Sequence, residues 1–264
     1  MIDLHAHVLP GVDDGPASLD DAVAVVRAHE QAGVRVICAT SHVSHRYPNT
    51  PARLAEAARA LRAGLGAAGI GVEILGGAEI ATEMLGGLDD DDLARLSLGG
   101  GPNLLIESPL RSSAGDIDVI VERLLREGHG VVLAHPERCP VFRREPARLT
   151  ALVAAGARCS LTASALSGRF GDTVRRFSGR LVEDGLVHDL ASDAHDLAGR
   201  KPGLVEHLRA AAGDLPGIEQ LAGWLTEEAP RALLAGERVP APPARIRRAA
   251  RPRGLRARLL PGRR

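Results

Sequence analysis

Histidines and aspartates near the start of this sequence have the spacing of metal ligands. The chain opens with MIDLHAHVLPGVDDG, where His5 and His7 lie two positions apart in an apolar run and Asp13 and Asp14 precede a glycine. Side chains two apart on a β-strand share a face, so both imidazoles could bind one ion. The opening segment therefore suggests half of a metal site, for which the rest of the chain must supply the other ligands.

Similar polar residues follow the other apolar segments. The runs VICAT, VEILGG, NLLI, VVLA and VHDLAS are followed, in this order, by His42, Glu79, Glu107, His135 and the pair Asp193 and His195. Imidazole nitrogens and carboxylate oxygens together suit Zn²⁺, Mn²⁺ or Fe²⁺. With His5 and His7 the set holds eight potential ligands, too many for one ion, which predicts a cluster of two or three metals.

Taken singly, these residues have ordinary explanations. A histidine at a strand end is more often a hydrogen-bonded structural residue, and Glu79 or Glu107 could stabilise the amino end of a helix. Asp13 and Asp14 could form an Asx turn. Together, however, buried histidines and carboxylates without cations would leave unpaired charge, which is costly. The joint pattern therefore favours a metal centre.

Strand-like and helix-like segments alternate along the chain and would position these ligands. Strands are predicted at 1–9, 34–40, 71–80, 103–108, 130–136, 157–164 and 186–195, and helices at 18–33 (with Ser18 as N-cap), 51–68, 116–128 and 145–156. About seven strand–helix units indicate a parallel α/β barrel or a doubly wound sheet. In such a barrel, the side chains at the carboxyl ends of the strands converge on one mouth.

The composition is that of an ordinary globular chain of 264 residues, 45% hydrophobic and 25% charged. No apolar stretch approaches the roughly 20 residues that span a bilayer. Asp3, His5 and His7 would interrupt the apolar core of a signal peptide. Three cysteines without a C-x-x-C spacing predict a reducing compartment, so we expect a cytoplasmic protein.

The charge is distributed unevenly along the chain. Residues 238–264 contain ten arginines and no acid, which leaves 23 basic against 33 acidic residues in the body. We therefore predict one domain over residues 1–237 and an Arg/Pro-rich, disordered tail over residues 238–264. The alternative is an arm that binds an acidic partner, an acidic lipid surface or nucleic acid.

Six stretches of the sequence resemble, in order, the motifs of the polymerase and histidinol phosphatase (PHP) superfamily: DLHAHVLPGVDDGP, ATSHVS, GGAEI, LLIES, LAHPER and ASDAH. Within it, LPGVDDGP and AHPER look most like the manganese-dependent protein-tyrosine phosphatases of bacterial capsule and exopolysaccharide loci. The resemblance covers roughly residues 1–205. It implies a distorted (β/α)7 barrel with a trinuclear centre that holds Mn²⁺, with Fe or Zn as alternatives.

Carried over by position, the resemblance assigns the ligands to three metals. The groups are His5, His7 and Asp193; Glu79 and His135, with Glu107 as a bridge to the first metal; and Asp14, His42 and His195. Arg138 corresponds to a phosphate-binding arginine, and Arg200 falls where a second one is expected. Where the family usually has T-P-H-H this chain has TSHVSH, so His45 either replaces the missing histidine or is a surface residue.

The ligand set and the resemblance together predict metal-dependent hydrolysis of phosphomonoesters. The resemblance implies phosphotyrosine proteins as substrates, above all a bacterial tyrosine autokinase of polysaccharide export. His42, His195 or Asp3 could protonate the leaving group, and Asp3 could instead orient a ligand histidine or lie on the surface. A cysteine-based phosphatase is excluded, because no cysteine is followed six positions later by an arginine.

Two other classes of function stay open. The same site could act on histidinol phosphate, on another small phosphomonoester or on a nucleic-acid phosphodiester. Nucleic acid is the less favoured substrate, because only 2% of the residues are aromatic and could stack on bases. The second class is a metal-binding interaction protein without catalysis, which would act through its basic tail.

Overall fold

Parallel strands form the centre of the molecule. The structure, a computed structural model, describes residues 1–111 and 116–247. Within these residues the strand orders are β1-β2-β4 in one sheet and β3-β5-β6-β7-β8-β9 in the other. The strands are Ile2–Ala6 (β1), Val36–Ala39 (β2), His42–Val43 (β3), Glu73–Gly76 (β4), Glu79–Ile80 (β5), Asn103–Glu107 (β6), Gly130–Ala134 (β7), Arg158–Thr162 (β8) and Asp189–Ala191 (β9). The predicted α/β class with parallel strands is confirmed.

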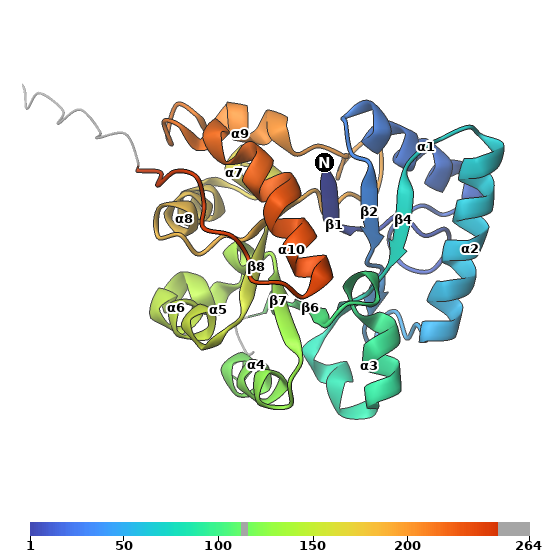
Figure 1. Cartoon of the computed structure of the whole chain (residues 1–264), viewed down its shortest axis with the longest axis horizontal. Helices are drawn as coiled ribbons and strands as arrows, with labels where there is room; N and C mark the ends of the chain where they lie inside the picture. The colour runs from blue at the N-terminus through green and yellow to red at the C-terminus, as the bar shows by residue number, and fades with distance from the viewer. Residues whose placement is uncertain (112–115, 248–264) are drawn as a thin grey trace, which may run out of the picture.

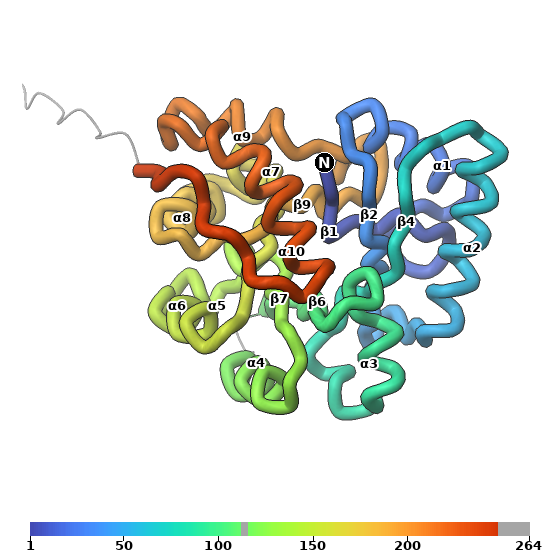
Figure 2. Tube along the Cα trace, in the orientation of Figure 1, coloured from blue at the N-terminus to red at the C-terminus, as the bar shows by residue number. Residues whose placement is uncertain are grey.

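The two sheets meet where β9 lies beside β1 (Figure 2). Short gaps separate β2 from β3 and β4 from β5, so each pair is one interrupted strand. The chain after β9 returns to β1, where the amide of Asp193 donates to the carbonyl of His5 (2.9 Å) and the amide of His7 donates to the carbonyl of Ala194 (2.9 Å). β1 therefore lies between β2 and the segment that follows β9.

Helices surround the strands (Figure 1). They are Leu19–Gln31 (α1), Pro51–Ala67 (α2), Asp90–Leu96 (α3), Ile117–Arg126 (α4), Pro140–Arg144 (α5), Pro146–Ala155 (α6), Ala163–Leu166 (α7), Asp172–Glu183 (α8), Val205–Ala211 (α9) and Ala229–Ala235 (α10). The hydroxyl of Ser18 accepts the amide of Asp21 (3.2 Å), which confirms the predicted N-cap of α1. Among the described residues, no helix combines the length and the apolar character that crossing a membrane requires.

Apolar side chains pack on both sides of the strands. One cluster joins β1, β2, β6 and β7 to α10, through Leu4, Cys38, Leu105, Val132 and Leu233. A larger cluster packs the alternate strand residues, such as Ile37 and Leu104, against the surrounding helices. α10 crosses the amino ends of the strands, where the Asn103 side chain donates to the carbonyl of Leu233 (2.6 Å). The candidate ligands lie at the opposite, carboxyl ends.

An acidic side chain lies buried at the start of β9. Asp189 is fully buried and accepts a hydrogen bond from the hydroxyl of Ser160 (2.5 Å). Burial and the nearby Asp3 carboxylate raise the pKa of Asp189 to about 8, although the Ser160 hydrogen bond opposes this shift. A carboxyl group with a raised folded-state pKa stabilises the fold below its unfolded pKa of about 3.9 and loses that contribution as pH rises through its folded pKa.

Asp189→Asn is expected to remove this pH dependence. Between about pH 5 and pH 8 the free energy of unfolding of the wild type should fall relative to that of the variant, because Asp189 is ionised in the unfolded wild type but keeps its proton in the fold. Urea unfolding at several pH values measures the difference, with the exposed Asp184→Asn as the matched control. A gap between Asp189→Asn and wild type that stays constant with pH would contradict the interpretation.

The first part of the predicted tail lies against the body of the molecule. Ile246 is 4% exposed, and the indole nitrogen of Trp224 donates to the carbonyl of Pro240 (3.0 Å). Residues 238–247 are therefore placed by contacts with the residues that precede them. Residues 248–264, which hold the rest of the predicted disordered tail, lie outside the described residues, and the domain boundary at residue 237 stays a prediction.

Candidate metal centre and active site

The structure brings the predicted ligands together at the carboxyl ends of the strands. They come from β1, β3, β5 and β6 and from the residues that follow β1, β7 and β9. Four groups have ligand atoms within 4.8 Å of one another: His7, Asp14, His42 and His195; His5, His7 and Asp193; His5, Glu79 and His135; and His42, Glu79 and Glu107. Within the described residues, each of the nine predicted metal ligands belongs to at least one group that could hold a metal ion.

The carboxylate of Glu79 lies at the centre of this cluster. Its Oε2 atom is 3.2 Å from Nε2 of His5, 3.3 Å from Nε2 of His7 and 3.1 Å from Nδ1 of His42. Its Oε1 atom is 2.6 Å from Nε2 of His135. The imidazoles hold the pKa of Glu79 well below its usual range, although burial acts in the opposite direction. Glu79 is therefore an ionised carboxylate that belongs to two of the four groups and lies close to members of the other two.

Glu107 lies beside Glu79 at the wall of the cluster. The resemblance predicts Glu107 as the bridge between two metals, but the structure groups it with Glu79 and His42, and gives Glu79 the position closest to several ligand groups. Burial and the carboxylates of Glu79 and Glu83 raise the pKa of Glu107 to about 8. A bound cation would relieve this repulsion. Bridging by Glu107 stays a prediction, and the geometry makes Glu79 the stronger candidate.

The arrangement of ring nitrogens fits metal ions better than hydrogen bonds alone. Nε2 of His5 and Nε2 of His7 are 3.2 Å apart, and Oδ1 of Asp193 lies 3.5 Å from the first and 3.7 Å from the second. Nδ1 of His135 and Nε2 of His195 are buried without a hydrogen-bond partner in the described part of the chain. Nitrogen and oxygen atoms that face one another across such distances suit a shared cation, which binds an imidazole in its deprotonated form.

Asp13 holds His7 in the orientation that a metal ligand needs. Its Oδ2 atom lies 2.8 Å from Nδ1 of His7 and accepts the amide of His42 (3.0 Å), while Oδ1 accepts the amide of Gly15 (3.0 Å). A Cβ atom at Gly15 would lie 2.7 Å from the carbonyl of His7, so this close turn requires glycine. Asp13 thus forms the Asx turn that the sequence predicts and also orients His7, a role that the sequence analysis misses.

Protonation differs among the histidines of the cluster. Burial would lower the pKa of His7, but hydrogen bonds to Asp13 and Glu79 raise it to about 10. Burial lowers the pKa of His42 to about 4, although Glu79 opposes this shift, and burial also lowers the pKa of His195. Neutral imidazoles keep a lone pair for a metal ion. For His42 and His195 these shifts favour the predicted role of ligand over that of proton donor.

Two site residues have strained backbone conformations. His135 has φ 36° and Asp193 has φ 52°, and within the described residues these are the non-glycine residues with positive φ. Each such conformation costs about 1–3 kcal/mol and persists only where the surrounding structure requires it. The positive φ angles turn the chain sharply after β7 and after β9. These turns direct the side chains of His135 and Asp193 into the cluster.

Two arginines reach the same carboxylate from different loops. Nη1 of Arg138 donates to Oδ2 of Asp193 (2.9 Å), and Nη2 of Arg200 donates to Oδ1 of Asp193 (2.5 Å). The guanidinium of Arg138 also lies 4.5 Å from the ring centroid of Phe170. Both arginines line a cavity of about 720 Å³ together with His42, Glu107 and His135. Their remaining N–H groups could bind the oxygens of an anion beside the metal ligands.

The rim of the cavity contains residues that the sequence analysis treats as uncertain or misses. His45 is exposed and lines the cavity, but it belongs to none of the ligand groups found in the described residues. Tyr47 stacks on His42 with ring centroids 5.7 Å apart. An aromatic ring five residues after His42 carries no motif signal, because its position depends on how the loop after β3 folds back.

Asp3 is buried behind the cluster, not on the surface. Its Oδ1 atom accepts the amides of His5 (3.3 Å) and Ser192 (3.1 Å), and its Oδ2 atom lies 3.4 Å from Nε2 of His29 on α1. It therefore holds the backbone that carries His5 and the segment before Asp193. The sequence analysis offers Asp3 as a residue that orients a ligand histidine. Among the described residues, its carboxylate contacts the ring of His29 and no ring of a proposed ligand.

Fold and site together define a class of protein: a parallel α/β chain that gathers histidines, carboxylates and two arginines at the carboxyl ends of its strands. The chain belongs to the family described as capsular polysaccharide synthesis, CpsB/CapC, whose sequence profile matches residues 1–215.

Proteins with known names resemble this chain over most of its length. It is 38% identical over 204 residues to the tyrosine-protein phosphatase YwqE of Bacillus subtilis (strain 168), which covers 76% of this chain and 79% of that protein. It is 29% identical over 234 residues to the tyrosine-protein phosphatase CpsB of Streptococcus agalactiae, which covers 81% of this chain and 90% of that protein. A chain from the crystal structures of YwqE from Bacillus subtilis and CpsB from Streptococcus pneumoniae, described as unique metal-dependent tyrosine phosphatases, matches with a TM-score of 0.79 and 34% identity over 93% of this chain and 100% of that one.

Proposed function

We propose that this chain is a metal-dependent protein-tyrosine phosphatase. The observation that carries the proposal is the cluster itself, in which nine histidine and carboxylate ligands lie beside Arg138 and Arg200 at one cavity. The relatives YwqE and CpsB carry the name tyrosine-protein phosphatase, and the matching solved structures are described as metal-dependent. The site and the relatives therefore support the same chemistry, hydrolysis of a phosphate ester with the help of metal ions.

We propose three metal ions, Mn²⁺ by the family resemblance, with Fe or Zn as alternatives. The ligand sets that the resemblance implies are His5, His7 and Asp193; Glu79 and His135 with Glu107; and Asp14, His42 and His195. The first and third sets lie within ligand groups of the structure, whereas Glu107 is grouped with Glu79 and His42 and not with His135. When bound, such ions polarise phosphoryl oxygens and make water nucleophilic near neutral pH. The protein would contribute the fixed positions of the ligands, which Asp13 and the strained turns at His135 and Asp193 maintain.

Arg138 and Arg200 would bind the phosphoryl oxygens that face the cavity. Asp193 holds both guanidinium groups through hydrogen bonds, so their planar forks are positioned before a substrate arrives. Donors that are fixed in advance stabilise the charge that develops during phosphoryl transfer without reorganisation. We propose that the two arginines provide this stabilisation.

The dimensions of the site favour a protein substrate over a small phosphomonoester. The cavity of about 720 Å³ adjoins a second hollow of about 540 Å³, and Arg200 lines both. Arg169 and Lys201 line the second hollow, which gives a cationic surface beside the cluster. A phosphotyrosine in the first cavity could extend its polypeptide into the second. Histidinol phosphate, small phosphomonoesters and phosphodiesters are the alternative substrates, and a non-catalytic metal-binding protein is the alternative function.

Purified protein tests these alternatives directly. We expect hydrolysis of p-nitrophenyl phosphate with added Mn²⁺ and its loss in excess chelator, because the proposed chemistry depends on bound metal. Comparison of kcat/KM for phosphotyrosine peptides, phosphoserine peptides and histidinol phosphate identifies the substrate class. Activity that persists in excess chelator would overturn the metal dependence, and a preference for histidinol phosphate would overturn the proposed substrate.

Asp13→Asn is expected to weaken metal binding about 10–100-fold, the usual cost of removing a hydrogen-bond partner behind a metal ligand. An amide keeps the shape of the Asx turn but removes the charge that holds Nδ1 of His7. Titration against a competing metal chelator measures the affinity, and circular dichroism checks the fold. Asp20→Asn, at an exposed position on α1, is the matched control. Unchanged metal affinity in Asp13→Asn would contradict the proposed orienting role.

Three finer expectations are proposed with the function. We propose that the strands form the distorted (β/α)7 barrel, which is supported by the hydrogen bonds between β1 and the segment after β9. A bacterial tyrosine autokinase of polysaccharide export is the proposed partner, with the basic tail as an additional contact for an acidic partner or surface. The cytoplasm is the proposed location, supported by the free, buried cysteines Cys38, Cys139 and Cys159.

A further inference from the structure

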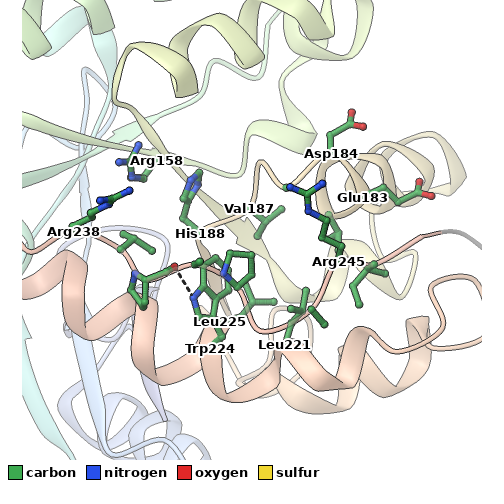
Figure 3. A pocket seen from close by; sticks show the side chains of 18 residues that line it. Arg158, Glu183, Asp184, Val187, His188, Leu221, Trp224, Leu225, Arg238 and Arg245 are labelled. Atoms are coloured by element: carbon green, nitrogen blue, oxygen red, sulfur yellow. Dashed lines mark hydrogen bonds between the residues drawn. The ribbon is translucent and has the colours of Figure 1, made fainter.

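A further hollow, separate from the two beside the candidate metal ligands, lies at the amino ends of β8 and β9 (Figure 3). Its volume is about 550 Å³, and its walls are the C-terminal segment 238–246, the turn between α8 and β9, and the helical turn that contains Trp224. Among the described residues, it shares no lining residue with the candidate active-site cavity. The hollow is therefore a separate feature that the proposed phosphatase reaction does not use.

His188 lines this hollow with a neutral imidazole ring. The backbone amide of Cys159 donates to Nδ1 of His188 (3.2 Å), so Nδ1 must carry a lone pair. Burial and the nearby Arg158 guanidinium lower the pKa of His188 to about 4, which keeps the ring neutral at pH 7. The ring proton is therefore on Nε2, and the backbone of Leu186 lies close enough to the ring to oppose the fall in pKa.

Two arginines accompany His188 at the same end of the hollow. Figure 3 shows Arg158 and Arg238 there, whereas Glu183 and Asp184 lie towards the other end with Arg245. Arg158 uses Nη1 for the carbonyls of Gly156 (3.0 Å) and Ala157 (2.9 Å). Neither Arg158 nor Arg238 has an ion pair within the described residues. Two guanidinium groups without a carboxylate partner favour an anion.

The middle of the hollow is apolar. Trp224 is 4% exposed, and its indole nitrogen donates to the carbonyl of Pro240 (3.0 Å), which fixes the orientation of the ring. Val187, Leu221 and Leu225 line the same region. An apolar wall with a few polar groups at one end is typical of small-molecule sites, whose volumes run from about 300 to 1,000 Å³.

We propose that this hollow binds a small organic anion, in which a phosphate, phosphonate or carboxylate group contacts Arg158 and Arg238 while an apolar or aromatic body packs beside Trp224. The C-terminal segment forms one wall and supplies Arg238. Ligand binding would therefore hold residues 238–246 against β8 and β9. This inference does not depend on the proposed phosphatase activity.

Trp224 permits a direct test, because it is the only tryptophan in the chain. The full-length, metal-loaded protein is titrated with phenylphosphonate, whose C–P bond a phosphatase does not hydrolyse, and tryptophan fluorescence is recorded. We expect a saturable change with phenylphosphonate, weaker binding of inorganic phosphate because it lacks the apolar body, and no change with benzyl alcohol because it lacks the anion. No saturable change at millimolar phenylphosphonate would overturn the proposal.

Substitutions of single arginines distinguish a specific anion site from nonspecific attraction of anions by positive charge. Arg238→Gln is expected to raise the Kd for phenylphosphonate at least about tenfold, since it removes a charged hydrogen-bond donor. Arg247→Gln removes the same charge from an exposed position of the same segment and should leave the Kd unchanged. Equal weakening by both variants would overturn the proposed site. Arg138→Ala should keep the full fluorescence change, and loss of that change would place the ligand in the active-site cavity instead.

Discussion

Glu79→Gln is expected to lower kcat/KM for phosphotyrosine peptides by about 1,000-fold and to reduce the amount of bound metal. Metal ions stabilise the charge of the transition state by several kcal/mol, and this stabilisation depends on ligands that hold the ions. Each 1.36 kcal/mol of lost stabilisation lowers the rate tenfold. The substitution keeps the size and shape of a side chain that is 1% exposed, so the packing around it is preserved. Metal analysis and steady-state kinetics measure the two effects.

The size of the expected effect follows from the position of Glu79. Its two oxygens approach nitrogens of four imidazoles, those of His5, His7, His42 and His135. A glutamine would direct N–H groups towards some of these lone pairs and would remove the negative charge that attracts cations. The loss therefore reaches more than one of the proposed metal positions.

Glu73→Gln is the matched control for this experiment. Glu73 begins β4, the strand that leads into β5, and its side chain is exposed. The same chemical change at this position should leave metal content and activity unchanged. If Glu79→Gln retained both its metal and its rate, the carboxylate at the centre of the cluster would have no role in the reaction, and the proposed metal chemistry would be wrong.

The residues of the cluster could be predicted from the sequence because of a property of parallel strands. Strands that run in one direction bring their carboxyl ends to the same edge of the sheet. A polar residue at the end of an apolar run is therefore expected at that edge. His42, Glu79 and His135 follow three separate apolar runs, yet they lie in neighbouring ligand groups. Alternation of strands and helices also predicts the order of the elements.

Contacts that depend on the path of a loop could not be predicted in this way. Asp13 reaches His7 because the loop after β1 folds back over the strand, and the sequence GVDDG indicates a turn without indicating where the carboxylate points. Asp3 meets His29 through the packing of α1, which no local pattern encodes. The choice of Glu79 over Glu107 as the central carboxylate likewise depends on side-chain direction at the break between β4 and β5.

The C-terminal segment shows that amino-acid composition alone does not predict which residues pack against the domain. Averaged over residues 238–264, the abundance of arginine and proline predicts a solvated tail. Within residues 238–247, however, Ile246 packs into the main apolar core and Pro240 accepts the hydrogen bond of Trp224. One apolar side chain and one carbonyl in the right places suffice to hold a short segment, and an average over many residues conceals them.

Arg138→Ala is expected to lower kcat/KM by at least about 100-fold, the usual cost of removing one fixed donor that stabilises developing charge. Metal content should stay near that of the wild type, because Arg138 is not a proposed ligand and Asp193 keeps its hydrogen bond from Arg200. Arg138→Lys should restore little activity, since an ammonium group cannot offer two parallel N–H donors to a phosphate or the flat contact with Phe170. Metal analysis and peptide kinetics on both variants measure these effects.

Arg144→Ala, at an exposed position on α5, controls for the loss of one positive charge near the site. It should change kcat/KM by less than about twofold, because an exposed charge outside the cavity is screened by solvent and salt. A similar loss in Arg144→Ala and Arg138→Ala would mean that general electrostatic attraction, not a positioned guanidinium, accounts for the effect. A normal rate in Arg138→Ala with normal metal content would remove Arg138 from the phosphate site and leave Arg200 as the remaining candidate, because both guanidinium groups line the same cavity.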